Sequence, residues 1–259
     1  MVADDDNKGK LSQPYDLPEI VRKVRARTPA RLLPGRCGAA YRTNTQLDLR
    51  EAHAAARDAV RTEVSSIPGI VDALIRAWKM FEVGSCATNK DEYLLRPDLG
   101  RRLNAASREE LSRRAQAGDL QIAIGDGLSI TAVATQVPSL LSLLCEGATH
   151  RGWSLGPIFL IRHCRVGILN EIGELLNPKV AVLLIGERPG LATAESLSAY
   201  MAYRPNPSHT DANRNLISNI HARGVSPEQA ADRILDLAAS MMKVQNSGWQ
   251  LREQFRALP

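Results

Sequence analysis

The chain has 259 residues, 44% of them hydrophobic and 24% charged, a mixture typical of a globular protein rather than a disordered or fibrous one. Its longest unbroken apolar run, 180–185, is far shorter than the roughly 20 residues that span a membrane. The four cysteines are scattered without a CxxC pair, and the five histidines are isolated, so no metal site is predicted. We therefore expect a globular protein of the reducing cytoplasm without membrane contact.

The N-terminal part of the chain carries most of the net charge. We expect residues 1–16 to form a flexible tail. Residues 19–50 contain eight Lys or Arg against two acids, whereas the formal charge of the whole chain is +5. This basic segment is either a footprint for nucleic acid, acidic lipid or a protein partner, or a solvated helix face. Because aromatic residues make up only 4% and nucleic-acid motifs are absent, we favour the solvated face or a protein partner.

Residues 17–118 are predicted to form a helical arm and N-terminal region. Apolar residues fall largely on one stripe between 47 and 60, and a second apolar stretch runs from Ile67 to Phe81. The polar segment Asn89 to Pro97 indicates a loop. A helix rich in Arg, Glu and Ala is expected from Leu99 to Ala117, where Gly118 ends it.

Residues 119–259 have a different pattern, in which short apolar strands alternate with helices. Strands are predicted at 120–125, 157–161 and 180–186, and helices around 133–145, at 171–176 and at 227–244. Ser226, Pro227 and Gln229 have the spacing of a capping box at the start of the last helix. Continuous apolar strands indicate a parallel sheet covered on both faces. The predicted fold class is thus α/β, with a Rossmann-like domain and a mainly parallel sheet after the helical region.

Two loops that follow predicted strands are candidate ligand sites, because ligands bind beyond the carboxyl ends of parallel strands. Residues 125–129 contain Asp126 between glycines, and residues 186–190 contain Glu187 in the same setting. Acidic loops bind phosphate poorly but accept N–H groups well. Alternatively, Asp126 caps the following helix and Glu187 pairs with Arg188.

Catalytic patterns are weak along the whole chain. Ser129 and Ser196 lack a G-x-S-x-G setting, and Cys164 beside His163 and Arg165 is better interpreted as a plain buried cysteine. We predict no catalytic residue and no metal ligand in this chain. From the residues alone, it is an α/β binding module with a basic helical arm.

Several segments carry a more specific resemblance. They are VGILNEIGELLNPKVAVLLIGERPGL from Val166 onward, ESLSAYMAYRP, RNLISNIHARG, IGDGLS, YLLRPDLGRRL and PARLLPGRCGAAYRTNTQLDL. In this order and spacing, from about residue 17 onward, the chain resembles the small (light) subunit of ethanolamine ammonia-lyase.

This resemblance implies an adenosylcobalamin-dependent lyase that converts ethanolamine to acetaldehyde and ammonia by a radical route. It implies a large subunit with a TIM barrel that holds substrate and catalytic side chains, and six copies of each subunit. This chain would close over the cobalamin at the interface, and its basic arm would dock to the large subunit. The cofactor would supply the difficult chemistry and the protein its position and the exclusion of water.

The resemblance also implies three cobalamin contacts. Val166 would present main chain to the corrin rim, and Glu187 would accept a hydrogen bond from a cofactor amide or hydroxyl. Leu216 occupies a position where some relatives have cysteine, so a contact there is main chain or van der Waals. Asp126 is added from the strand-end argument alone. Because a D-x-H-x-x-G signature is absent, we expect no histidine of this chain to replace the cofactor's own base on cobalt.

A stand-alone corrinoid-binding or carrier module is the alternative function. A Rossmann-type enzyme would need its own acid–base pair, which the sequence does not show. We expect the bacterial cytoplasm as location. Packaging into a microcompartment is less favoured, since only about 16 residues precede the region of resemblance.

Overall fold

The computed structural model describes residues 18–253 apart from 29–30, 115 and 117, so the predicted tail 1–16 lies outside the described residues. The chain forms two compact units, Met1–Leu47 and Asp48–Pro259. In the first unit, α1 (Glu19–Ala26) precedes a two-stranded antiparallel ribbon of β1 (Arg36–Cys37) and β2 (Ala40–Tyr41). Helix α2 (Thr43–Arg61) begins in this unit and continues into the second.

The second unit is built on a six-stranded sheet with the order β3-β5-β4-β6-β7-β8. The first four of these strands are parallel, and β7 runs antiparallel to both of its neighbours. The strand bounds are β3 (Phe81–Gly84), β4 (Leu120–Gly125), β5 (Phe159–Arg162), β6 (Val180–Gly186), β7 (Leu197–Tyr203) and β8 (Asn215–Ile220).

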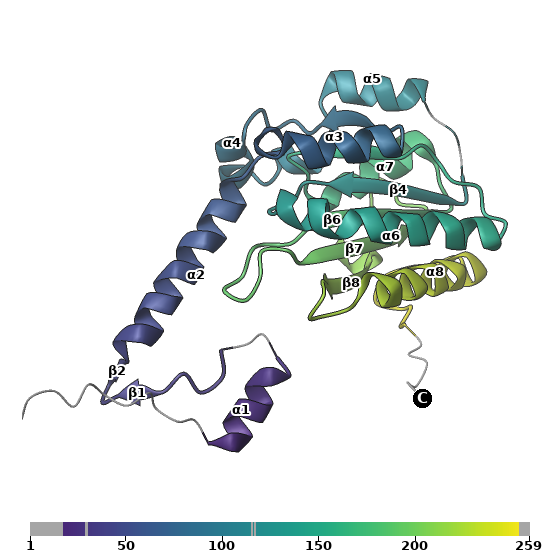
Figure 1. Ribbon diagram of the computed structural model, residues 1–259. Helices are drawn as coiled ribbons and strands as arrows, with labels where there is room; N and C mark the ends of the chain where they lie inside the picture. Colours follow the sequence, from purple (N-terminus) through teal and green to yellow (C-terminus); the bar gives the residue numbers. More distant parts are fainter. Residues whose placement is uncertain (1–17, 29–30, 115, 117, 254–259) are drawn as a thin grey trace, which may run out of the picture. The chain divides into compact units, whose positions relative to one another are not determined.

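Helices cover both faces of this sheet. The helices of the second unit after α2 are, in chain order, η1 (Val64–Ser66), α3 (Pro68–Ala77), α4 (Lys90–Leu95), η2 (Leu99–Arg101), α5 (Ala105–Arg113), α6 (Ile130–His150), η3 (Val166–Ile168), α7 (Leu169–Leu176), η4 (Asp211–Asn213) and α8 (Pro227–Val244). Helices α3, α6 and α8 pack against the larger apolar cluster on one face (Figure 1). Helix α7 packs on the opposite face over the smaller cluster, beside α5.

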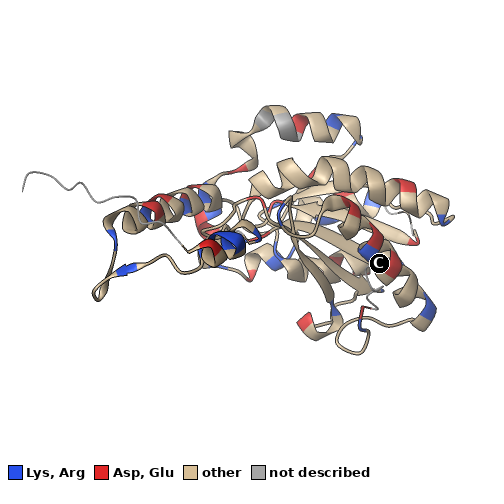
Figure 2. Cartoon of the chain, turned by 60° about the horizontal axis from the view of Figure 1, so that its bottom comes forward, with Lys and Arg blue, Asp and Glu red and all other residues tan. Residues whose placement is uncertain are grey.

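Helix α6 is the central helix of the larger cluster. It contains one charged residue, Glu146, and Figure 2 shows it almost entirely in tan. Its length and hydropathy are those of a helix that could cross a membrane. In this structure ten of its residues are buried, and it packs against α8 and β6. We therefore describe it as a core helix of the α/β unit.

The strongest sequence signals are confirmed. Strands β4 and β6 have the predicted bounds, and all their residues are buried because helices cover both faces. Helix α8 is capped by Ser226 in the predicted capping box, in which Gln229 N–H donates to the Ser226 hydroxyl at 3.3 Å. The structure is therefore mixed α/β with a mostly parallel sheet. The Rossmann-like assignment and the domain boundary at 118/119 stay predictions.

Other expectations are wrong in detail. Residues 81–84, expected within a helical region, form strand β3, so the sheet includes a strand from before residue 118. The expected loop 89–97 contains α4, and the expected helix 99–117 is divided into η2 and a shorter α5. The antiparallel strands β7 and β8 were not predicted at all. They extend the sheet beyond β6, the strand that precedes Glu187, and Leu216 lies on β8.

Candidate functional site

Asp126 follows β4 and is buried, with 3% of its surface exposed. Its carboxylate accepts the main-chain N–H groups of His163 at 2.8 Å and Cys164 at 2.9 Å. The alternative that Asp126 caps α6 is wrong, because Ser129 is the cap and accepts from Ala132 N at 3.2 Å. Asp126 therefore fixes the loop after β5 that leads to Val166.

Charged and aromatic side chains surround Asp126. Lys90 is 6% exposed and donates to the Gly127 carbonyl at 3.2 Å. The hydroxyl of Tyr93 donates to the Cys164 carbonyl at 2.9 Å, and the Arg165 guanidinium lies 4.3 Å from the centre of the Tyr93 ring. Burial lowers the pKa of Lys90 and raises the pKa of Asp126, while the charge of each opposes the shift of the other.

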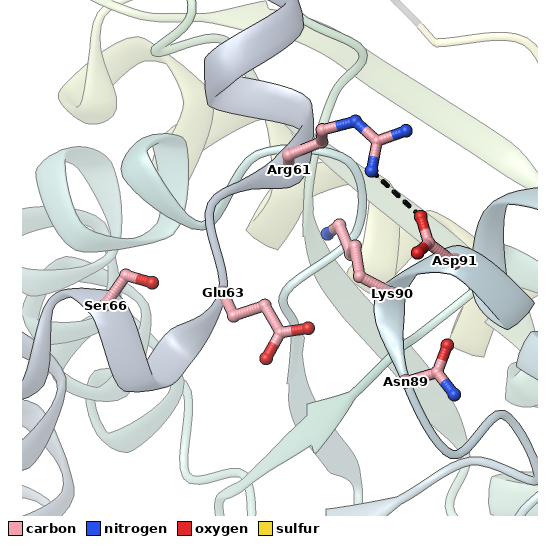
Figure 3. A pocket seen from close by; sticks show the side chains of 6 residues that line it. All are labelled: Arg61, Glu63, Ser66, Asn89, Lys90 and Asp91. Carbon is pink, nitrogen blue, oxygen red and sulfur yellow. Dashed lines mark hydrogen bonds and ion pairs between the residues drawn. The ribbon is translucent and has the colours of Figure 1, made fainter.

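A hollow of about 370 Å³ opens beside Lys90 (Figure 3). Arg61, at the end of α2, points toward Asp91 of α4 and pairs with it at 2.9 Å. Glu63, another residue of its wall, raises the pKa of Lys90 through its charge, after the larger effects of burial and Asp126. This hollow therefore gives the buried Lys90 a polar surrounding on its outer side.

The loops after β4 and β6 are joined directly. Leu128 N–H donates to the Gly186 carbonyl at 3.0 Å, and the Ser129 hydroxyl donates to the Ala194 carbonyl at 2.5 Å. Gly127 has φ +57°, and a Cβ there would collide with the Gly186 carbonyl. The loop that Asp126 fixes is thus packed against the loop that carries Glu187.

Glu187 follows β6 and has a half-buried carboxylate that accepts three hydrogen bonds. The donors are the hydroxyls of Ser196 at 2.7 Å and Ser198 at 2.5 Å and the main-chain N–H of Asn219 at 3.0 Å. The alternative of an ion pair with Arg188 is not realised in the part of the chain that the structure describes. A carboxylate has about four acceptor positions, so one remains for a ligand.

Val166 and Leu216 present different chemistry. Val166 begins η3, and its side chain packs on the smaller apolar cluster. Its N–H and that of Gly167 meet no acceptor among the described residues. Leu216 of β8 is 46% exposed and lies opposite Tyr200 of β7 in the strand register. Val166 and Gly167 thus offer main-chain donors, and Leu216 offers an apolar contact.

The predicted site residues thus fall into two linked pairs. Asp126 holds the loop before Val166, and Glu187 binds the strand that carries Leu216. Tyr200 of β7 interacts with both members of the second pair. It lies opposite Leu216 in the strand register. Burial raises the pKa of Tyr200, and the charge of Glu187 raises it further. Sequence reasoning missed the residues that position them: Lys90, Tyr93, Ser198 and Asn219. Only the polar character of the SLS and SNI segments could have indicated two of them.

Cys164 is confirmed as a plain buried cysteine. Burial, and then the charge of Asp126, raises the pKa of its thiol well above the usual range. Within residues 18–253, leaving out the gaps, no group of three or more His, Cys, Asp or Glu is placed to hold a metal ion.

Comparison with known proteins matches residues 18–252 to the family described as ethanolamine ammonia-lyase light chain (EutC). The chain belongs to this light-chain family. It is 40% identical to the ethanolamine ammonia-lyase small subunit of Clostridium perfringens, over 90% of this chain and 78% of the relative. The small subunit of Clostridium acetobutylicum is 38% identical over 92% of this chain and 97% of its own length.

A third relative, the small subunit of Pseudomonas syringae pv. tomato, is 41% identical over 90% of this chain and 82% of its own length. The light-chain family is thus one of ammonia-lyase subunits, and the resemblance found in the sequence is confirmed. A light chain also implies a larger partner subunit.

Proposed function

We propose that this light chain is the small subunit of an adenosylcobalamin-dependent ethanolamine ammonia-lyase, which converts ethanolamine to acetaldehyde and ammonia. It forms part of the cobalamin site at the interface with the catalytic large subunit. The observation that carries the proposal is the family match over residues 18–252. The geometry of the strand-end surface supports the part that this chain plays.

The residues present fit the chemistry of a corrinoid. Its corrin ring carries amide side chains on its rim, which both donate and accept hydrogen bonds. Glu187 has an acceptor position left, and the N–H groups of Val166 and Gly167 are donors without acceptors among the described residues. Leu216 supplies exposed apolar surface on β8. A set of donors, one acceptor and an apolar contact suits an amide-rich rim better than a phosphate loop would.

In this account the small subunit binds and orients, and the large subunit acts on the substrate. When bound, adenosylcobalamin supplies radical chemistry through homolysis of its cobalt–carbon bond. Glu187 accepts an N–H or O–H from the cofactor, and the main chain at Val166 donates to it. Asp126 keeps the loop before Val166 in place without touching the ligand, since its carboxylate already binds two amides in a buried position.

The basic segment 19–50 is proposed to dock to the large subunit, whose fold we expect to be a TIM barrel, in an assembly with six copies of each chain. Support comes from the first unit itself. Helix α1 contains no buried residue, and Ile20 and Leu33 are mostly exposed next to basic side chains. Exposed apolar residues among cations are typical of a surface that a partner covers.

Reconstitution tests this proposal. The chain is mixed with a large subunit of the same enzyme class, adenosylcobalamin and ethanolamine, and acetaldehyde release is measured. Turnover should require both chains and the cofactor. Turnover by the small subunit in isolation would contradict the proposal. Tight cobalamin uptake by the small subunit alone, with no gain from the large subunit, would instead support the stand-alone corrinoid-binding module.

A further inference from the structure

A second hollow, of about 850 Å³, lies beside the proposed corrin site and is rich in arginine. Its walls come from the segment after α4, the start of α5, helix α7 and the connection between β7 and β8. Its volume is within the range of small-molecule sites, about 300–1,000 Å³. Four of its lining residues are cations: Arg101, Arg102, Arg108 and Arg214.

Two of these arginines are neutralised by acids of α7. Arg108 pairs with Glu171 at 3.1 Å and with Glu174 at 3.5 Å, and Arg102 lies 3.8 Å from Glu171. Arg101, by contrast, is exposed, and its guanidinium has neither an ion pair nor a hydrogen bond to any described residue. The hollow therefore keeps one cation available to a ligand.

Arg214 gives an independent indication of a ligand. Its side chain is 5% exposed and donates to Asp211 and, at 2.8 Å, to Asn170. Its Nε is buried without a partner, and so is Nδ1 of His209 in the same wall. Buried polar atoms nearly always have hydrogen-bond partners, so two such atoms lining one hollow point to a missing acceptor.

The charges around Arg214 indicate which acceptor fits. Burial lowers the pKa of Arg214, and after the opposing effect of Asp211 the nearby charge of Arg101 lowers it further. Two guanidinium groups that face one hollow repel each other, and an anion between them removes this cost. Oxygen atoms of a phosphate ester match guanidinium donors in both charge and geometry.

The hollow adjoins the surface assigned to the cofactor. Gly167 lines it directly after Val166, and Tyr200, opposite Leu216, interacts electrostatically with both Glu187 and Arg214. We propose that this hollow binds the phosphodiester of the cobalamin nucleotide tail, with Arg101 and Arg214 as its cations. The proposal rests on the proposed function, and it assigns to this subunit a tail site separate from the contacts of the corrin rim.

Cobinamide tests the proposal, because it has the corrin ring and its amides but lacks the nucleotide tail and its phosphate. Dissociation constants of adenosylcobalamin and adenosylcobinamide are measured by equilibrium dialysis on the complex of both subunits. Arg101→Gln should weaken adenosylcobalamin binding about tenfold, the loss expected for one charge-assisted hydrogen bond. Adenosylcobinamide binding should stay within about twofold of the wild type.

Two further variants complete the test. Arg214→Lys, which keeps the charge of the buried group, should reduce the affinity for adenosylcobalamin selectively as well. Arg76→Gln is the matched control, since Arg76 is an exposed arginine of α3 on the other face of the sheet. It should leave the binding of both corrinoids unchanged.

Four outcomes would overturn the inference. In the first, Arg101→Gln weakens the binding of both corrinoids equally, and in the second it weakens the binding of neither. In the third, the variant no longer assembles with the large subunit. In the fourth, Arg101 is needed for binding of inorganic phosphate but not of cobalamin. Loss of assembly would mean that an acidic segment of the large subunit fills the hollow. In the last case calorimetry with inorganic phosphate detects binding that Arg101→Gln abolishes, while cobalamin affinity is unaffected. If the wild-type complex binds neither corrinoid, the proposed function itself is wrong and the inference falls with it.

Discussion

The carboxylate of Glu187, directly after β6, accepts the main-chain N–H of Asn219, near the end of β8, at 3.0 Å. In the sheet order β7 lies between β6 and β8, and Ser198 of β7 and Ser196, the residue before this strand, supply the other two donors. Asn219 has φ +62°, a left-handed conformation that asparagine tolerates better than most residues. The carboxylate therefore fixes an unusual turn of the chain at the surface proposed for the cofactor.

Glu187→Gln should weaken both this connection and cofactor binding. In the variant an amide NH₂ replaces one carboxylate oxygen. This NH₂ cannot accept a hydrogen bond from the donors that the oxygen binds, and the negative charge is lost as well. We expect a loss of about 1–2 kcal/mol in the free energy of unfolding and about tenfold weaker cobalamin binding by the two-chain complex. Urea unfolding and absorbance titration measure the two effects.

Glu195→Gln is the matched control for this variant, because Glu195 is an exposed acid of the same loop. It should change neither quantity. Cobalamin affinity that is equal in the Glu187 variant and the wild type would remove Glu187 from the cofactor site.

Leu216→Ser should separate binding from stability. The side chain is exposed on β8, so its loss should change the free energy of unfolding by less than about 0.5 kcal/mol. If Leu216 packs against the corrin, cobalamin binding should weaken about fivefold, since about 1 kcal/mol of apolar contact is lost. Val244→Ser, at a similarly exposed aliphatic position that ends α8, should leave binding unchanged. Equal affinity in both variants would contradict a contact at Leu216.

Asp126 and Lys90 should behave as an energetically coupled pair. Asp126→Asn removes an acceptor from one of two loop amides and leaves Lys90 buried without its counter-charge. Each of Asp126→Asn and Lys90→Met should destabilise the chain by about 2–4 kcal/mol. The double variant should lose clearly less than the sum of the two, as measured by urea unfolding of all four proteins. Additive losses would show that the two groups act independently.

The strands of the sheet differ in how far the sequence could predict them. Strands β4 and β6 were found because fully buried parallel strands are continuously apolar. Strand β3 has four residues with only Val83 buried, a pattern that does not distinguish it from the end of a helix. Lys90 was overlooked because lysine is rarely buried, and only the folded chain brings it to Asp126.

The candidate site shows the same limit. Asp126 and Glu187 could be placed at strand ends, because the strands before them were clear. Their partners could not, since the amides that Asp126 binds lie 37 and 38 residues away and Asn219 lies 32 residues from Glu187. The two hydrogen bonds to main-chain amides and the 3% exposure of Asp126 favour a positioning role over the direct ligand contact expected from the strand-end argument.

Asp119, which directly precedes β4, should make stability depend on pH at the end of the strands opposite to Asp126. Its carboxylate binds Lys179 at 2.7 Å and the N–H of Ser154 at 2.8 Å, and these partners lower its pKa to about 2. The pKa in the unfolded chain is about 3.9, so the stabilisation is complete above about pH 4 and is lost as the pH falls toward 2.

Asp119→Asn should accordingly reduce the free energy of unfolding by about 1–2 kcal/mol at pH 7. The difference from the wild type should shrink between about pH 4 and pH 2. Urea unfolding of both proteins across this range checks the sign. A difference that is independent of pH would contradict the assignment of the effect to the Asp119 charge.

A cryo-EM map of the assembly of both subunits with adenosylcobalamin tests the central claim most directly. The account predicts corrin density against Val166, Glu187 and Leu216, at the surface where β6, β7 and β8 meet the start of α7. Cofactor density held by the large subunit alone, with no contact to these three residues, would contradict it.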